Sequence, residues 1–224
     1  MNNPNPPILN APRIVSLLLG ANLAVCVVKS IAPYDFEYWL LQRFAFVAVS
    51  YTEPGTWMSD PIYLVLAPIT YMFLHVDFIH FAINMAMLLA FGTVIARRMG
   101  TSHYLAFYLI CGVISAASWA LFNPGSTSPV IGASGAISGM FGAVGRLSLS
   151  TPRPDAQPFS YFNRRTGLTF VLVWIVLNFM FGALGGAVFG VDADIAWEAH
   201  LGGFVAGYLL IGLFDGKGQR ASVP

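Results

Sequence analysis

The chain has 224 residues, of which 57% are hydrophobic and 9% are charged, and its formal net charge is +1. Soluble domains carry about a quarter charged residues, so this composition excludes an ordinary soluble protein and indicates one built for lipid. A net charge so close to zero gives no indication of a nucleic-acid partner, and none is expected.

Apolar windows of about 20 residues predict six membrane spans, at residues 14–32, 76–96, 102–122, 130–148, 167–189 and 195–214. The first run has no short hydrophobic core followed by a cleavage site, so we expect it to remain as a transmembrane helix. The predicted fold class is all-α, a polytopic bundle of six transmembrane helices. We expect a single domain over residues 13–214, with cytoplasmic tails at 1–12 and 215–224.

A long connection at residues 33–75 separates the first two spans. It mixes aromatic side chains such as Trp39 and Trp57 with acidic ones. Aromatic and charged residues together are typical of a segment at the membrane surface, so an interfacial element lying on the membrane is predicted there.

The placement of Lys and Arg predicts the orientation of the spans, because cytoplasmic loops are enriched in them. One set of connections holds nine basic residues and the opposite set holds two. Both termini are therefore predicted to be cytoplasmic, with the long first loop outside. The nine are Arg13, Arg97, Arg98, Arg146, Arg153, Arg164, Arg165, Lys217 and Arg220, and the two are Lys29 and Arg43.

Five polar residues lie at or just inside the outer ends of apolar segments: His75, His80, Asn84, Ser134 and His200. Polar groups inside a bilayer are costly, so their presence indicates function. A serine, histidines and an asparagine are the groups required for nucleophilic acyl transfer with a stabilised oxyanion. The predicted topology brings all five to the same leaflet.

Ser134 lies in a glycine-rich segment, Gly-Ala-Ser-Gly at residues 132–135. A helix from residue 134 to residue 149 would cover only about 24 Å. The hydrocarbon layer is about 30 Å thick, so the serine would lie below the outer surface, beside backbone that must be shielded or line a water-filled cavity. A helix N-terminus also offers unpaired N–H groups to an anion.

The alternative is that the small residues of this segment serve helix packing. We favour this interpretation for Ser138, Gly139, Gly142 and Gly145.

His200 is followed by Gly203 and Gly207, which share its helix face. Small residues allow two helix backbones to approach closely, and the fourth span offers a matching surface. Such an approach would bring the imidazole within reach of Ser134, as a general base. The alternative is a histidine that bonds a backbone carbonyl.

His80 and Asn84 are four residues apart and share a face, and His75 lies nearer the membrane surface. Three histidines also suggest a metal, but there is no His-Glu-x-x-His string and neither Cys26 nor Cys111 is well placed. We therefore expect no metal and no cofactor.

Three blocks together resemble the rhomboid family of intramembrane serine proteases: HVDFIHFAIN at 75–84, GASG at 132–135, and AHLGG at 199–203 with Gly207 beyond it. The likeness extends over nearly the whole chain. It implies that Ser134 is the nucleophile and His200 the general base, without an acidic third member. It also implies that His80 and Asn84 contribute to the oxyanion hole with the Ser134 N–H, and that His75 supports the site at its entrance.

The resemblance further implies that substrates are single transmembrane helices cut near their outer ends. The fifth span, with its outer Gly185-Gly186 connection, resembles the gate through which such a helix approaches. The expected location is a bacterial inner membrane, with the site opening to the periplasmic side. The sequence leaves the oligomeric state open.

Two positions differ from the common family pattern. Leu66 and Ala67 stand where a Trp-Arg pair is frequent, and Ser138 stands where an aromatic residue often stacks on the catalytic imidazole. A hydrogen bond from Ser138 to His200 is one possible replacement.

Two other functions are alternatives. A rhomboid-like pseudoprotease would bind transmembrane helices without cutting them, although inactive relatives typically lose the serine or the histidine, and both are present here. A small transporter would require repeats in matching halves, which the sequence does not have.

Overall fold

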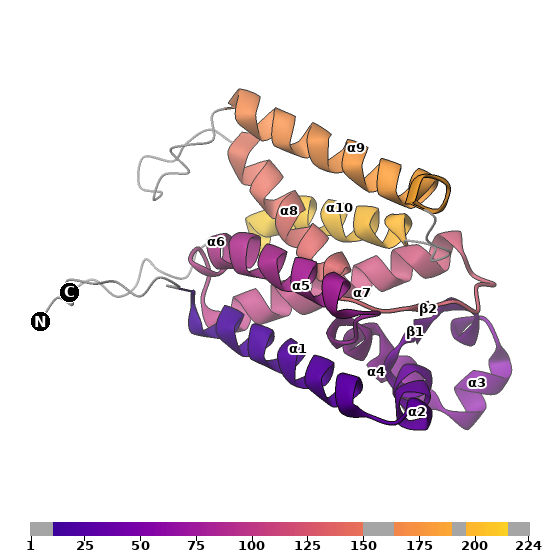
Figure 1. The fold of residues 1–224 in the computed structure, drawn as a ribbon. Helices are drawn as coiled ribbons and strands as arrows, with labels where there is room; N and C mark the ends of the chain where they lie inside the picture. Colours follow the sequence, from indigo (N-terminus) through magenta and orange to yellow (C-terminus); the bar gives the residue numbers. More distant parts are fainter. Residues whose placement is uncertain (1–10, 150–163, 190–195, 215–224) are drawn as a thin grey trace, which may run out of the picture.

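The computed structural model describes residues 11–149, 164–189 and 196–214 (Figure 1). Almost all of the tail predicted at 1–12 and all of that at 215–224 therefore lie outside the described residues. The regular elements of the described chain are helices apart from one pair of two-residue strands, so the predicted all-α class is confirmed.

The elements in chain order are α1 (Arg13–Ile31), α2 (Tyr34–Phe44), β1 (Phe46–Val47), η1 (Ala48–Tyr51), α3 (Pro54–Ser59), α4 (Pro61–Thr70), η2 (Tyr71–Phe73), α5 (Phe78–Met87), η3 (Leu88–Gly92), α6 (Thr93–Ala96), α7 (Thr101–Phe122), β2 (Pro129–Val130), α8 (Ser134–Leu149), α9 (Arg164–Phe189) and α10 (Trp197–Phe214).

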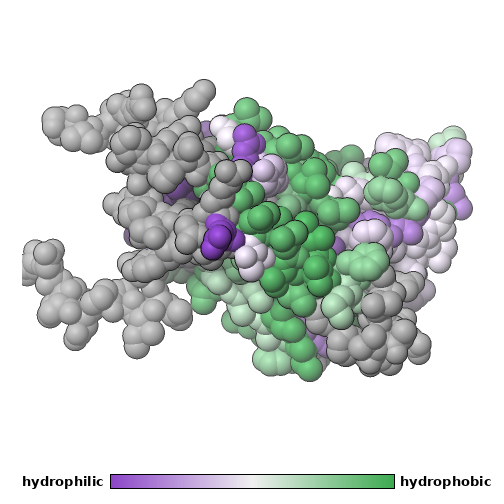
Figure 2. Space-filling model, turned by 90° about the horizontal axis from the view of Figure 1, so that it is seen from above, coloured by the Kyte–Doolittle hydropathy of each residue, from purple (hydrophilic) through white to green (hydrophobic). Residues whose placement is uncertain are grey.

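Four helical stretches within the described residues are long and apolar enough to cross a membrane: α1, the run from α5 to α6, α7 and α10. Each coincides with a predicted span. The fourth predicted span is a shorter helix of 16 residues, α8, and the fifth corresponds to α9. Figure 2 shows hydrophobic residues as a continuous band across the middle of the visible face, with more hydrophilic residues toward its edges. These features describe a multi-pass membrane protein.

Helix α8 occupies the centre of the bundle, packed against α7, α9 and α10. Every residue from 135 to 145 except Phe141 is buried. Glycines let the backbones of α8 and α10 touch, since a Cβ added to Gly207 would lie 1.7 Å from the carbonyl oxygen of Gly139. A Cβ on Gly142 would likewise lie 2.0 Å from the carbonyl oxygen of Phe204. The small residues of α8 thus serve helix packing, as predicted.

The connection at 33–75 differs from the expected surface element in its last third. In its first part the helices α2 and α3 have no buried residue, and only the short stretch between them, at Ala45, Phe46 and Ala48, is buried. By contrast, α4 and η2 enter the bundle, where Tyr71 is 1% exposed and its hydroxyl donates to the Gly112 carbonyl at 2.8 Å. The prediction was wrong for this part because a short apolar helix interrupted by Pro68 resembles a loop in a 20-residue window.

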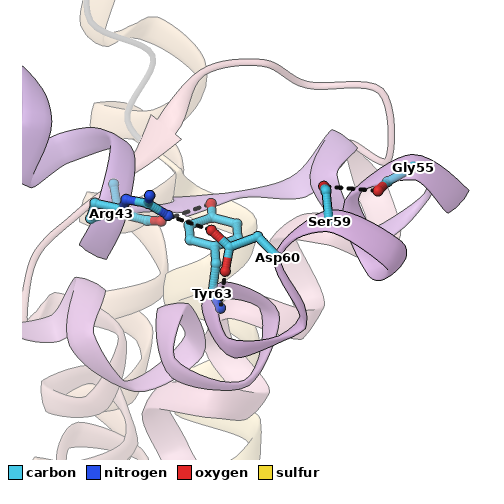
Figure 3. A network of polar contacts seen from close by, with 6 residues as sticks. Arg43, Gly55, Ser59, Asp60 and Tyr63 are labelled. Carbon is cyan, nitrogen blue, oxygen red and sulfur yellow. Dashed lines mark hydrogen bonds and ion pairs between the residues drawn. The ribbon is translucent and has the colours of Figure 1, made fainter.

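The entrance to α4 is held by a polar network, shown in Figure 3. The Asp60 carboxylate accepts the Tyr63 N–H at 3.1 Å, which caps the helix, and forms an ion pair with Arg43 at the end of α2. The Tyr63 hydroxyl donates to the Ala45 carbonyl at 3.0 Å. These contacts join the end of α2 to the start of α4, at the turn where the connection enters the bundle.

Several basic residues lie at one end of the bundle. In Figure 1 the start of α1 at Arg13, the end of α6 and the end of α8 all lie toward the left, whereas α2, α3 and the β1–β2 pair lie toward the right. Arg146 lies in the last turn of α8. Among the described residues, the connections that the sequence predicts to be cytoplasmic thus lie at the same end of the bundle, and the orientation in the membrane stays a prediction.

Gly185 and Gly186 lie within α9 rather than in a connection after it. The expected connection is therefore wrong. A transmembrane helix tolerates glycine because its backbone hydrogen bonds have no competing water.

Candidate active site

The position of Ser134 follows from the backbone just before it. Gly132 has a φ of +124°, which side-chain-bearing residues rarely adopt, and its N–H donates to the Tyr71 carbonyl at 2.9 Å. This turn ends the extended segment at β2 and allows α8 to begin at Ser134, the residue predicted. The first N–H groups of a helix have no intrahelical partner, so the serine lies beside available donors.

His200 is placed in the first turn of α10, directly opposite Ser134. Its Nε2 lies 2.8 Å from the Ser134 Oγ. Contact between the helices makes this possible, because a Cβ on Gly203 would lie 2.1 Å from the Gly135 carbonyl oxygen. Ser115 of α7 fixes the same turn by donating to the Ala199 carbonyl at 2.7 Å. The structure therefore brings together the predicted hydroxyl and imidazole, and both residues are partly exposed.

A third residue, Asn178 of α9, contacts the imidazole and was not identified from the sequence. Its Oδ1 lies 3.0 Å from His200 Nδ1. The sequence did contain a signal for it, because Asn178 is a polar side chain inside the apolar run at 167–189. Asn84 was identified by the same kind of signal. Its meaning was hidden because 22 residues separate it from His200 and no helical spacing links the two.

Ser138 is buried in α8, and it does not form the hydrogen bond to His200 that was one possible replacement for the stacked aromatic residue. Both ring nitrogens of His200 have other partners, Asn178 and Ser134. Asn178 of α9, rather than Ser138, therefore contacts the imidazole at Nδ1, the ring nitrogen that does not face Ser134.

His80 lies beside Ser134, across the turn at Gly132. A Cβ added to Gly132 would lie 3.0 Å from His80 Nε2 and 3.6 Å from Ser134 Oγ. Asp77 caps α5 by accepting the His80 N–H at 2.7 Å, so the helix begins just before this histidine. His80 and Ser134 thus approach the same space, which only a glycine at position 132 leaves open.

Asn84 is one turn further along α5 and is 4% exposed. Its Nδ2 donates to the His80 carbonyl at 2.9 Å, while its Oδ1 is buried with no hydrogen-bond partner among the described residues. One amide hydrogen therefore remains for a further acceptor. The sequence placed Asn84 and His80 on one face, and the contact agrees.

His75 lies before α5, is 4% exposed and packs edge-on against His80, with ring centroids 5.2 Å apart. Neither ring nitrogen has a hydrogen-bond partner among the described residues. Burial, together with the nearby His80, lowers the pKa of His75 to about 4. His75 is thus a buried, uncharged ring packed against the ring of His80.

The serine, the imidazole and the flanking donors form an arrangement suited to acyl transfer. Ser134 can give its proton to His200, and the N–H groups at the start of α8 can face a developing oxyanion.

The rhomboid domain family matches residues 65–216, more than half of the chain. This chain belongs to the rhomboid family. It is 32% identical over 140 residues to the rhomboid protease GluP of Bacillus subtilis, a match that covers 62% of this chain and 24% of that protein. The mitochondrial rhomboid protein 1 of Saccharomyces cerevisiae is 26% identical over 219 residues. This match covers 88% of this chain and 52% of that protein.

RHOMBOID-like protein 5 of Arabidopsis thaliana is 30% identical over 142 residues, covering 63% of this chain and 41% of that protein. The chain thus spans between about a quarter and about half of the length of these curated relatives. Their similarity shows the family and supports a rhomboid membrane domain.

Proposed function

We propose that this rhomboid is an intramembrane serine endopeptidase that hydrolyses transmembrane helices near the outer membrane face through a Ser134–His200 dyad. The observation that carries the proposal is the 2.8 Å contact between Ser134 Oγ and His200 Nε2. A serine bonded in this way to an imidazole has a base for its proton, whereas a serine that only packs helices needs none.

In the proposed reaction, Oγ attacks the carbonyl carbon of the scissile peptide as its proton passes to His200 Nε2. The negative charge that develops on the carbonyl oxygen faces the N–H groups at the start of α8, with His80 and Asn84 as further donors. His200 then gives the proton to the leaving amine as the C–N bond breaks. Water, activated by His200, hydrolyses the acyl-enzyme and regenerates the serine.

The proposed substrate is a membrane-spanning helix that unwinds at the cut site. A helical backbone hides its carbonyls in internal hydrogen bonds, so segments with small or helix-breaking residues are the ones that can enter the site. A cut near one end of the membrane is supported by the positions of Ser134 at the start of α8 and of His200 in the first turn of α10.

Labelling by a fluorophosphonate probe tests the dyad directly. The purified full chain in detergent is expected to label, and Ser134→Ala and His200→Ala are expected to abolish labelling while the protein stays folded. Ser138→Ala is the matched control, because it removes a hydroxyl one turn further along the same helix, and it should label at the wild-type rate.

Cleavage of reconstituted transmembrane substrates should follow the same pattern. Undiminished labelling of a folded Ser134→Ala or His200→Ala variant would contradict the assigned dyad. A folded wild-type protein that neither labels nor cleaves would instead favour a pseudoprotease that binds transmembrane helices.

A further inference from the structure

The side-chain amide of Asn178 lies between a backbone carbonyl and the catalytic imidazole. Its Nδ2 donates to the Trp197 carbonyl oxygen at 3.2 Å, and its Oδ1 faces His200 Nδ1 at 3.0 Å. A carbonyl oxygen can only accept, so the NH₂ group must face Trp197 and the Oδ1 must face the ring. Two hydrogen bonds therefore determine the orientation of the amide.

This orientation also determines where the imidazole proton lies. Because Oδ1 is an acceptor, the Nδ1 of a neutral His200 must carry the hydrogen and donate it. The lone pair is then on Nε2, which faces the Ser134 hydroxyl at 2.8 Å. The opposite tautomer would leave Nε2 protonated and unable to accept the serine proton.

We propose that Asn178 is a positioning residue that holds His200 in the tautomer and orientation required of a general base, so that a neutral amide completes a Ser-His-Asn triad. This inference rests on the proposed function, since it assigns a role in the same reaction. Asn178 acts through the imidazole and does not contact the peptide.

The packing of α9 against the start of α10 holds Asn178 at the imidazole. A Cβ on Gly182, one turn beyond Asn178, would lie 2.2 Å from the Trp197 Cβ, so the helices are in direct contact there. One turn before Asn178, Trp174 stacks on Phe204, with ring centroids 4.3 Å apart. These contacts on both sides position the amide with little freedom.

No carboxylate takes this place among the described residues. Glu198 is the acid nearest in sequence to His200, and its Oε1 faces the Asn123 amide at 3.4 Å rather than the ring. The ionisable ring nearest Ser134 from the other side of the site is that of His80, which approaches across Gly132. Asn178 is thus the group in the position that an aspartate occupies in a Ser-His-Asp triad.

The test is the rate of fluorophosphonate labelling against pH for the full chain, Asn178→Leu and Asn178→Asp. In this reaction Ser134 Oγ forms a bond to phosphorus, the P–F bond breaks and fluoride leaves, and the serine proton passes to His200. Asn178→Leu should slow labelling by about 10- to 100-fold, less than the about 10⁴-fold loss seen where a triad carboxylate is replaced and the wrong tautomer results. Asn178→Asp restores an acceptor and should recover most of the rate.

The pH profile separates positioning from a merely structural role. The Oδ1 acceptor also stabilises the imidazolium, so its removal in Asn178→Leu should move the acidic limb of the profile to lower pH. A carboxylate in Asn178→Asp stabilises the imidazolium more, so the limb should move to higher pH. If Asn178 had only a structural role, both variants would label more slowly at every pH, and the midpoint of the acidic limb would stay at the wild-type pH.

Asn22→Leu is the matched control, since it removes a buried asparagine of α1 whose amide bonds its own helix, at Leu18. It should leave both rate and profile as in the wild type. Equal labelling rates and midpoints in the wild type and both Asn178 variants would overturn the inference while the proposed function stands. Failure of the folded wild-type protein to label would instead overturn the proposed function. If Asn178→Leu does not fold, the Asn178→Asp profile alone decides between a shifted and an unshifted limb.

Discussion

Asn84 illustrates at the residue scale how a side chain can assist a reaction without being indispensable. It is buried, with one amide hydrogen bonded to the His80 carbonyl and the other available. Asn84→Ala should slow probe labelling by less than the about 10²–10³-fold that follows loss of a single oxyanion donor elsewhere, because His80 and backbone N–H groups remain.

The same bond occurs far from the site and provides the control for this prediction. Asn22 in α1 donates to the Leu18 carbonyl at 2.8 Å, as Asn84 does to His80 at 2.9 Å. Asn22→Ala should therefore leave the labelling rate unchanged. A loss in Asn84→Ala as complete as that in Ser134→Ala, in a folded protein, would show that Asn84 is essential rather than auxiliary.

His75 makes stability depend on pH. Its folded pKa of about 4 lies below the value of about 6.5 for an unfolded histidine, so the unfolded chain binds a proton that the folded protein does not. The contribution of His75 to stability is therefore intact above about pH 6.5 and is lost as the pH falls toward 4. Between pH 7 and pH 5 the free energy of unfolding should fall by about 1–2 kcal/mol more in the wild type than in His75→Gln. Denaturant titrations in detergent would measure this difference, and parallel curves for the two proteins would contradict it.

At the scale of elements, the contact between α8 and α10 is the feature on which the site depends. A Cβ on Gly207 would lie 1.7 Å from the backbone oxygen of Gly139, which cannot move aside as a flexible side chain would. Gly207→Ala should therefore lower the free energy of unfolding by about 1–3 kcal/mol, as overpacking does elsewhere.

The matched control is Gly20→Ala, at an open position in α1 with no atom within 4 Å of the added Cβ. Because alanine favours helix by about 1 kcal/mol over glycine, this variant should be as stable as the wild type or slightly more so. Thermal unfolding in detergent would compare the two. A Gly207→Ala protein as stable as Gly20→Ala would mean that the helices separate at little cost.

At the scale of the whole molecule, the charge difference between the two ends of the bundle predicts its orientation in the membrane. We infer an orientation with both termini on the cytoplasmic side and α2 and α3 on the opposite side. Gly55 in α3 and Gly100 before α7 are both exposed, with no atom within 4 Å of an added Cβ, and they lie at opposite ends of the bundle. Cysteines at these positions form a matched pair of probes.

In a chain with Cys26→Ala and Cys111→Ala, a membrane-impermeant maleimide added to intact cells should modify Gly55→Cys. Gly100→Cys should react only after the membrane is made permeable. The reverse pattern would contradict the inferred orientation and would place the site at the cytoplasmic face.

The positions of the helices could be read from the amino-acid sequence because they depend on local properties. The length of each apolar run determines where the chain can cross lipid, and the glycines before Ser134 determine where α8 begins. Ser134 and His200 were found as polar groups in apolar segments, and the glycine spacing on α10 predicted their approach.

The packing of distant segments determined what no local pattern could indicate. The entry of α4 and η2 into the bundle depends on contacts such as that of Tyr71 with Gly112, and the partner of His200 Nδ1 depends on how α9 lies against α10. From residue type the sequence offered Ser138 as a partner of His200 and did not single out Asn178, although both side chains can form hydrogen bonds. Hydrogen bonds between side chains require atoms to meet within about 3 Å, and only the three-dimensional arrangement of the helices selects which polar groups do so.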